Sequence, residues 1–266
     1  LDLRMGLNLT GRHALVCGAS EGIGRAAAHE LALLGASVTL LARRADVLAE
    51  VMAALPRTPG GQHHDGIAGD VADAAPLQAK VSALAAARPI HILVNNTGGP
   101  PGGRAIDAVA DDYLAAFHRH LLANQLLAQL TVPGMRAAGW GRIINVVSTS
   151  VKEPIANLGV SNTIRGAVAS WAKTLSKELG AYGITVNNVL PGYTRTGRLE
   201  QILRDRVQAT GKDEAAVSAA MLASVPAGRF AEAHEVAAAI AFLATPAAGY
   251  VNGVSLAVDG GRMQSI

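Results

Sequence analysis

The chain has few aromatic residues, one cysteine and no long apolar run. Aromatic residues make up 3% of its 266 residues, and Cys17 is the only cysteine. A lone cysteine excludes a disulfide framework and favours a reducing compartment. The net charge is only +3 and no basic cluster exists beyond Arg43-Arg44, so we expect no nucleic-acid partner.

Membrane and metal sites are not indicated either. The apolar runs are too short to span a bilayer, and the start of the chain, LDLRMGLNLT, lacks a signal-peptide pattern. A first residue other than Met indicates trimming or an added segment before Met5. The histidines lack the spacing of metal ligands. We therefore expect a cytoplasmic protein with no membrane partner and no metal.

Apolar runs alternate with helical patterns along the chain. We expect strands at 13–19, 37–42, 66–71, 90–96, 142–148, 184–192 and 253–261. We expect helices at 23–34, 46–55, 74–87, 111–138 (bent at Pro133-Gly134), 161–181, 197–223 and 232–244. Strands with near-continuous apolar runs that alternate with helices predict a parallel, doubly wound sheet of the Rossmann type. Without a linker, residues 1–266 are expected to form one α/β domain, with 197–223 as a substrate flap.

The stretch CGASEGIG places Gly18, Gly22 and Gly24 between the first strand and the first helix. Glycines there allow a tight turn and a close approach of the backbone to a pyrophosphate, which the helix N-terminus attracts. This context predicts a dinucleotide site.

The second strand ends in Ala42-Arg43-Arg44, where an NAD site needs an acidic residue for the ribose 2′-hydroxyl. An arginine suits a 2′-phosphate instead. We therefore expect NADP(H) to be favoured over NAD(H). The alternative is that both arginines are solvated residues at a helix start.

Further motifs are Asp70-Val71, NNTG (95–98), RIINVVS ending at Ser148, LPGYTRT (190–196) and VDGG (258–261). With the glycine loop, they make the chain resemble the short-chain dehydrogenase/reductases over nearly its full length, most closely the 3-oxoacyl-acyl-carrier-protein reductase branch. The resemblance implies dimers or tetramers joined through the helices 111–138 and 161–181. It also implies a set of cofactor-binding residues: Gly18, Ser20, Gly22, Ile23, Gly24, Arg43, Arg44, Asp70, Val71, Asn95, Gly98, Arg165, Pro191, Gly192, Thr194 and Thr196.

The resemblance fails at the residues that carry the family's chemistry. Family members use a Ser, a Tyr that transfers the proton, a Lys that lowers the phenol pKa and holds the ribose, and an Asn. Alignment of the motifs keeps only Ser148, and places Ser161, Arg165 and His120 at the other three positions. A serine hydroxyl is a weaker acid than a phenol and does not reach as far. Arg165 can hold a ribose but cannot relay a proton.

Four sources of the proton remain open: water in the space of the missing ring, His120, Lys152 and Tyr193. Each of these side chains also has an ordinary structural interpretation. In that interpretation His120 packs or caps a helix, Lys152 forms a solvated pair with Glu153, and Tyr193 fills hydrophobic space. Two functions follow. One is an atypical NADP-dependent oxidoreductase acting on a small carbonyl or alcohol substrate. The other is a catalytically inactive dinucleotide-binding subunit or sensor.

Overall fold

Seven parallel strands form one sheet at the centre of the molecule. The computed structural model describes residues 6–265, and its strand order is β3-β2-β1-β4-β5-β6-β7. The strands are β1 (His13–Cys17), β2 (Ser37–Ala42), β3 (Asp65–Ala68), β4 (Ile92–Asn95), β5 (Gly141–Val146), β6 (Ile184–Pro191) and β7 (Ser255–Val258). All six neighbouring pairs are parallel. This confirms the expected Rossmann-type sheet.

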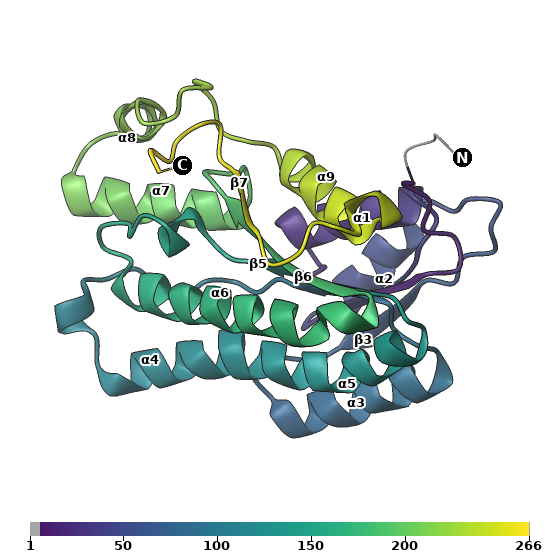
Figure 1. The fold of residues 1–266 in the computed structure, drawn as a ribbon. Helices are drawn as coiled ribbons and strands as arrows, with labels where there is room; N and C mark the ends of the chain where they lie inside the picture. Colours follow the sequence, from purple (N-terminus) through teal and green to yellow (C-terminus); the bar gives the residue numbers. More distant parts are fainter. Residues whose placement is uncertain (1–5, 266) are drawn as a thin grey trace.

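Helices cover both faces of the sheet, as Figure 1 shows. On one face lie α1 (Gly22–Leu33), α2 (Ala45–Ala53) and α9 (Ala233–Ala244); on the other lie α3 (Ala74–Ala87), α4 (Ala110–Phe117), α5 (Ala123–Ala137) and α6 (Gly159–Leu179). The helices α7 (Gly197–Thr210) and α8 (Glu214–Leu222) stand apart, near the carboxyl ends of β6 and β7.

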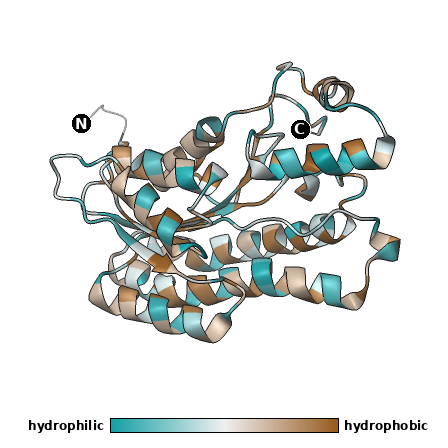
Figure 2. Ribbon diagram, turned by 180° about the vertical axis from the view of Figure 1, so that it is seen from behind, coloured by the Kyte–Doolittle hydropathy of each residue, from teal (hydrophilic) through white to brown (hydrophobic). Residues whose placement is uncertain are grey.

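The strands are mostly apolar because each one serves two cores. In β1, Ala14 and Val16 pack among α1 and α9, whereas Leu15 and Cys17 pack on the opposite face. Successive strand residues point to opposite faces, so a strand covered on both sides needs no polar positions. Figure 2 shows the hydrophobic strands between helices whose outer surfaces are more hydrophilic.

The largest departures from the predicted elements occur in the long helix and in the flap. Between α4 and α5 the segment η2 (His118–Leu122) is a π-helix, so the irregularity lies there, while Pro133 sits inside α5 without ending it. The single predicted helix 197–223 is two helices, because Gly211 adopts φ +68° and ends α7.

The last strand is also shorter than expected. It stops at Val258, since the Asp259 carboxylate accepts hydrogen bonds from the Gly261 and Met263 amides and closes a turn. Residues 1–5, on which the prediction of trimming or of an added segment before Met5 rests, lie outside the described residues. In residues 6–265 no helix is long and apolar enough to cross a membrane, and no group of three His, Cys, Asp or Glu side chains forms a metal site.

Candidate functional site

The predicted site residues gather at the carboxyl ends of the strands. The glycine loop follows β1, Arg43 follows β2, Asp70 follows β3, Thr97 follows β4 and Ser148 follows β5. Strand order reverses between β1 and β4, the point at which open α/β sheets form a ligand crevice.

The glycine loop is packed too tightly for side chains. A Cβ on Gly18 would lie 2.5 Å from the Asn96 carbonyl oxygen, and a Cβ on Gly24 would collide with the Gly18 carbonyl. Gly18 and Gly22 also have positive φ angles of +60° and +54°. At the start of α1, Glu21 makes no capping hydrogen bond, and the first turn contains no acidic residue. The first amides of α1 are therefore available to a phosphate group.

Two neighbouring asparagines of the NNTG motif serve different parts of the site. Asn96 donates through Nδ2 to the carbonyls of Cys17 (3.3 Å) and Gly18 (3.4 Å), which fixes the glycine loop. Asn95, which the resemblance places among the cofactor-binding residues, has a buried side chain that donates through Nδ2 to Asn145 Oδ1 at 2.9 Å. Asn95 therefore braces the strands, and Asn96, not singled out from the sequence, reaches the loop.

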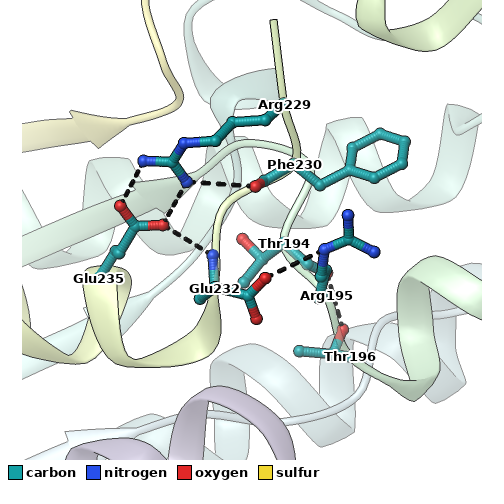
Figure 3. A network of polar contacts seen from close by, with 7 residues as sticks. All are labelled: Thr194, Arg195, Thr196, Arg229, Phe230, Glu232 and Glu235. Atoms are coloured by element: carbon teal, nitrogen blue, oxygen red, sulfur yellow. Dashed lines mark hydrogen bonds and ion pairs between the residues drawn. The ribbon is translucent and has the colours of Figure 1, made fainter. Parts of the chain in front are cut away.

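The loop Pro191–Thr196 after β6 is clamped to the start of α9. Arg195 Nε lies 3.0 Å from Glu232 Oε1, and Arg229 binds Glu235 with two hydrogen bonds of 2.7 and 2.6 Å (Figure 3). The Glu232 amide donates to Glu235 Oε2 at 2.8 Å, which joins the two ion pairs. The clamp gives a loop without regular structure a fixed position.

This loop lies against the glycine loop. A Cβ on Gly22 would be 3.1 Å from Thr196 Cγ2, and a Cβ on Gly192 would be 2.7 Å from Asp259 Cα. Thr194 is buried and donates to the Gly192 carbonyl at 3.2 Å, while Thr196 donates to the Thr194 carbonyl at 3.2 Å. The predicted cofactor residues of β1 and β6 are therefore brought together.

At the other end of the crevice, Arg43 and Arg44 are exposed. Arg44 Nη2 binds Glu21 Oε2 at 2.9 Å, whereas Arg43 has no ion pair within residues 6–265. The Asp70 carboxylate accepts from the Ala72 amide at 2.9 Å. The remaining predicted positions here, Ser20, Ile23, Val71 and Gly98, are at least partly accessible.

Arg165 and His120 form a buried polar cluster with Thr97. Arg165 is 8% exposed and donates through Nη1 to the Val146 carbonyl (3.0 Å) and through Nη2 to the Thr97 carbonyl (3.3 Å). His120 Nδ1 lies 2.7 Å from Thr97 Oγ1. Ser161, one helical turn before Arg165, is buried too. Ser148 Oγ accepts from the Ser150 amide at 3.1 Å, which leaves its own proton free to donate.

Burial, more than the nearby charges, sets the protonation state of His120. Burial, followed by the charges of Arg165 and Arg119, lowers the pKa of His120 to about 2. Burial and the nearby Arg198 lower the pKa of Arg165 to about 10. Near pH 7 the cluster therefore contains a neutral imidazole and a charged guanidinium.

The other two predicted proton donors lie in different surroundings. Lys152 is exposed, and its neighbour Glu153 accepts hydrogen bonds from the amides of Gln264 and Ser265. The Tyr193 ring meets Phe230 edge-on at 6.2 Å and has the Arg262 guanidinium 4.7 Å from its centroid. These are the packing contacts of a hydrophobic filler, one of the two interpretations of Tyr193 that the sequence left open.

Sequence reasoning missed Arg198, in the first turn of α7. Arg198 Nη2 donates to the Pro100 carbonyl at 2.9 Å, so it connects α7 to the loop after β4. Its place two residues after the end of the LPGYTRT motif was the only signal available.

Comparisons with known proteins agree with this geometry. The family model described as enoyl-(acyl carrier protein) reductase matches residues 18–262. The 3-oxoacyl-[acyl-carrier-protein] reductase FabG of Vibrio harveyi is 33% identical over 96% of this chain and 98% of its own length. The short-chain reductase protein NovJ of Streptomyces niveus is 34% identical over 94% of this chain and 93% of its own.

Among solved structures, L-sorbose reductase of Gluconobacter frateurii, complexed with NADPH and L-sorbose, superposes with a TM-score of 0.91 at 30% identity. The superposition covers 98% of this chain and 100% of that one. The chain therefore belongs to the short-chain dehydrogenase/reductase family of oxidoreductases and resembles its 3-oxoacyl-acyl-carrier-protein reductases.

Proposed function

We propose that this protein is an NADP(H)-dependent oxidoreductase that interconverts a ketone and an alcohol without a tyrosine acid. The observation that carries the proposal is the glycine loop, which has no room for side chains and ends at the uncapped start of α1. A loop of this shape fits a dinucleotide pyrophosphate. Residues from five strand ends border the same crevice.

The preference for NADP(H) rests on Arg43. Its guanidinium is exposed at the end of β2 with no ion pair in the described chain, so it is available to a 2′-phosphate. Arg44 neutralises Glu21, the acidic residue that would otherwise repel that phosphate. The NADPH complex of the sorbose reductase supports the same preference.

The reacting end would work as follows. When bound, the nicotinamide supplies or accepts a hydride at C4. Ser148 would donate a hydrogen bond from its hydroxyl to the substrate oxygen, and the Arg165 cation would stabilise negative charge that develops near it. A neutral His120 lacks the acidic proton of an imidazolium, Lys152 is exposed, and the Tyr193 ring packs against Phe230 and Arg262. Water beside Ser161 therefore supplies the proton.

The absence of the family's tyrosine phenol should lower the rate of the reaction. General acid catalysis by a positioned side chain contributes roughly 10²–10⁴-fold. We therefore expect slow turnover of simple ketones and better turnover of activated ones.

The flap and the assembly belong to the same proposal. The buried apolar residues of α7 and α8, such as Leu203 and Met221, pack with Phe230 into a small core of their own. The flap would thus cover the substrate as a preformed unit of the single domain 1–266. We propose a cytoplasmic homotetramer or homodimer joined through the helices 111–138 and 161–181, where Leu114 and Leu122 are 54% and 41% exposed.

One observation favours a second function. A subunit that binds the dinucleotide without catalysis needs no proton donor at positions 161 and 165. Ser161 and the carbonyl-bound Arg165 are compatible with such a subunit. The protein would then be an inactive dinucleotide-binding subunit or sensor.

Titration of the purified protein with NADPH and with NADH, followed by nicotinamide fluorescence, tests the cofactor part of the proposal. We expect tight binding of NADPH and weak binding of NADH. Substrate-dependent oxidation of bound NADPH then separates the two functions, because the sensor predicts binding without oxidation. Binding of neither nucleotide refutes both.

A further inference from the structure

Two arginine side chains approach the same point beside Gly99. A Cβ placed on Gly99 would lie 3.5 Å from Arg198 Nη2 and 3.7 Å from Arg165 Nη2. Arg165 comes from α6 below the crevice, and Arg198 comes from the first turn of the flap helix α7. The point they share is next to the loop that follows β4.

Among the described residues, no carboxylate forms an ion pair with either arginine. The ion pairs within residues 6–265 use other arginines, and both guanidiniums here bind only backbone carbonyls: those of Val146 and Thr97 for Arg165, and that of Pro100 for Arg198. Carbonyl oxygens satisfy N–H groups but leave the positive charge uncompensated.

The arrangement is also incomplete in its hydrogen bonds. Arg165 Nε and His120 Nε2 are buried and have no hydrogen-bond partner in the part of the chain that the structure describes. Buried polar groups without partners are rare and costly, and a buried charge without a counter-ion is costlier still. A bound anion beside Gly99 would compensate both guanidiniums at once.

The proposed function places the phosphates of the cofactor away from these two arginines. The uncapped start of α1 faces the pyrophosphate position, and Arg43 stands at the far end of the crevice for the 2′-phosphate. Arg165 instead reaches the end of β5, two residues before Ser148, and Arg198 belongs to the flap. A planar carboxylate matches the fork of a guanidinium in two parallel hydrogen bonds.

We propose that Arg165 and Arg198 bind the carboxylate of an oxo acid whose carbonyl group is held at Ser148. The substrate is then an anionic carbonyl compound rather than a neutral ketone. The inference deepens the proposed function and rests on it. It also gives the replacement of lysine by arginine a purpose, because Arg165 exchanges a proton relay for anion recognition.

The test measures binding, so it does not depend on turnover. The probes are 2-oxobutanoate, acetoacetate and levulinate, each compared with its methyl ester. Their affinities are measured by nicotinamide fluorescence of the NADPH-loaded protein, and by thermal shift of the protein without NADPH. Arg198→Gln is the test variant. Arg204→Gln is the matched control, because Arg204 lies on the same helix, is 61% exposed and pairs with Glu200.

At least one acid should bind ten times more tightly than its ester. Arg198→Gln should weaken that acid about 10- to 100-fold, the range for a hydrogen bond to a charged group. The ester, the control variant and NADPH affinity should change less than twofold.

Equal binding of all acids and esters overturns the inference. So does an Arg198→Gln variant that loses NADPH affinity as strongly as acid affinity, since the pair would then serve a cofactor phosphate. The proposed function fails separately, through absent NADPH binding in the titration, while the thermal shift without NADPH still reports on the acid.

Discussion

The replacement of His120 by asparagine should remove part of the protein's sensitivity to acid. The imidazole is 2% exposed, lies 2.7 Å from Thr97 Oγ1 and has cationic neighbours in Arg165 and Arg119. Burial and those charges lower its pKa from 6.5 to about 2 in the folded protein. Unfolding releases the side chain into water, where it takes up a proton at its ordinary pKa.

This difference in pKa between the folded and unfolded states sets the direction in which stability changes with pH. Above pH 6.5 the imidazole is neutral in both states and costs nothing. As the pH falls from 6.5 toward 2, only the unfolded state binds the proton, so stability is progressively lost. Each pH unit in this window costs about 1.4 kcal/mol, which gives about 2 kcal/mol at pH 5.

Urea unfolding at pH 7.5 and pH 5 measures the effect. The loss of unfolding free energy between the two pH values should be about 2 kcal/mol smaller in His120→Asn than in the parent protein. His118→Asn is the control, because His118 is exposed in the same π-helical segment. An unchanged loss in His120→Asn would refute a neutral buried imidazole, and His120 would return as a proton donor.

Three other changes test the cofactor site and the chemistry. Gly24→Ala should abolish NADPH binding in a fluorescence titration, because the new Cβ collides with the Gly18 carbonyl; retained affinity would contradict the packed loop. Arg43→Ala should raise the dissociation constant of NADPH about 10- to 100-fold and leave that of NADH nearly unchanged, and equal effects on both would remove the 2′-phosphate role. Ser161→Tyr with Arg165→Lys should raise turnover of simple ketones by about 10²-fold or more, and no gain in a folded variant that binds NADPH would count against the missing acid as the limit on rate.

The sheet and the glycine loop could be predicted because their signals are local. Apolar runs such as the one at 92–94 report burial on both faces, and Gly18 and Gly24 report places where no side chain fits. Each of these signals is contained in a few consecutive residues. Strand ends were less certain, because turns such as the one at Asp259 depend on a single carboxylate.

The inside of the site could not be predicted in the same way. Arg165 from α6 and Arg198 from α7 both reach Gly99, and no spacing in the sequence brings them there together. The lowered pKa of His120 arises from burial and from an arginine on another helix. The different tasks of Asn95 and Asn96 depend on which face of the sheet edge each side chain takes.

Transfer of deuterium from NADPH to product tests the central claim most directly. The protein would be incubated with NADPH carrying deuterium at C4, on either face of the ring in separate samples, and with the oxo acids named above and neutral ketones. Mass spectrometry of the alcohol product should find one deuterium from one of the two cofactors only. If NADPH binds but no carbonyl compound gains deuterium from either cofactor, the protein binds the dinucleotide without hydride transfer, and the oxidoreductase account is wrong.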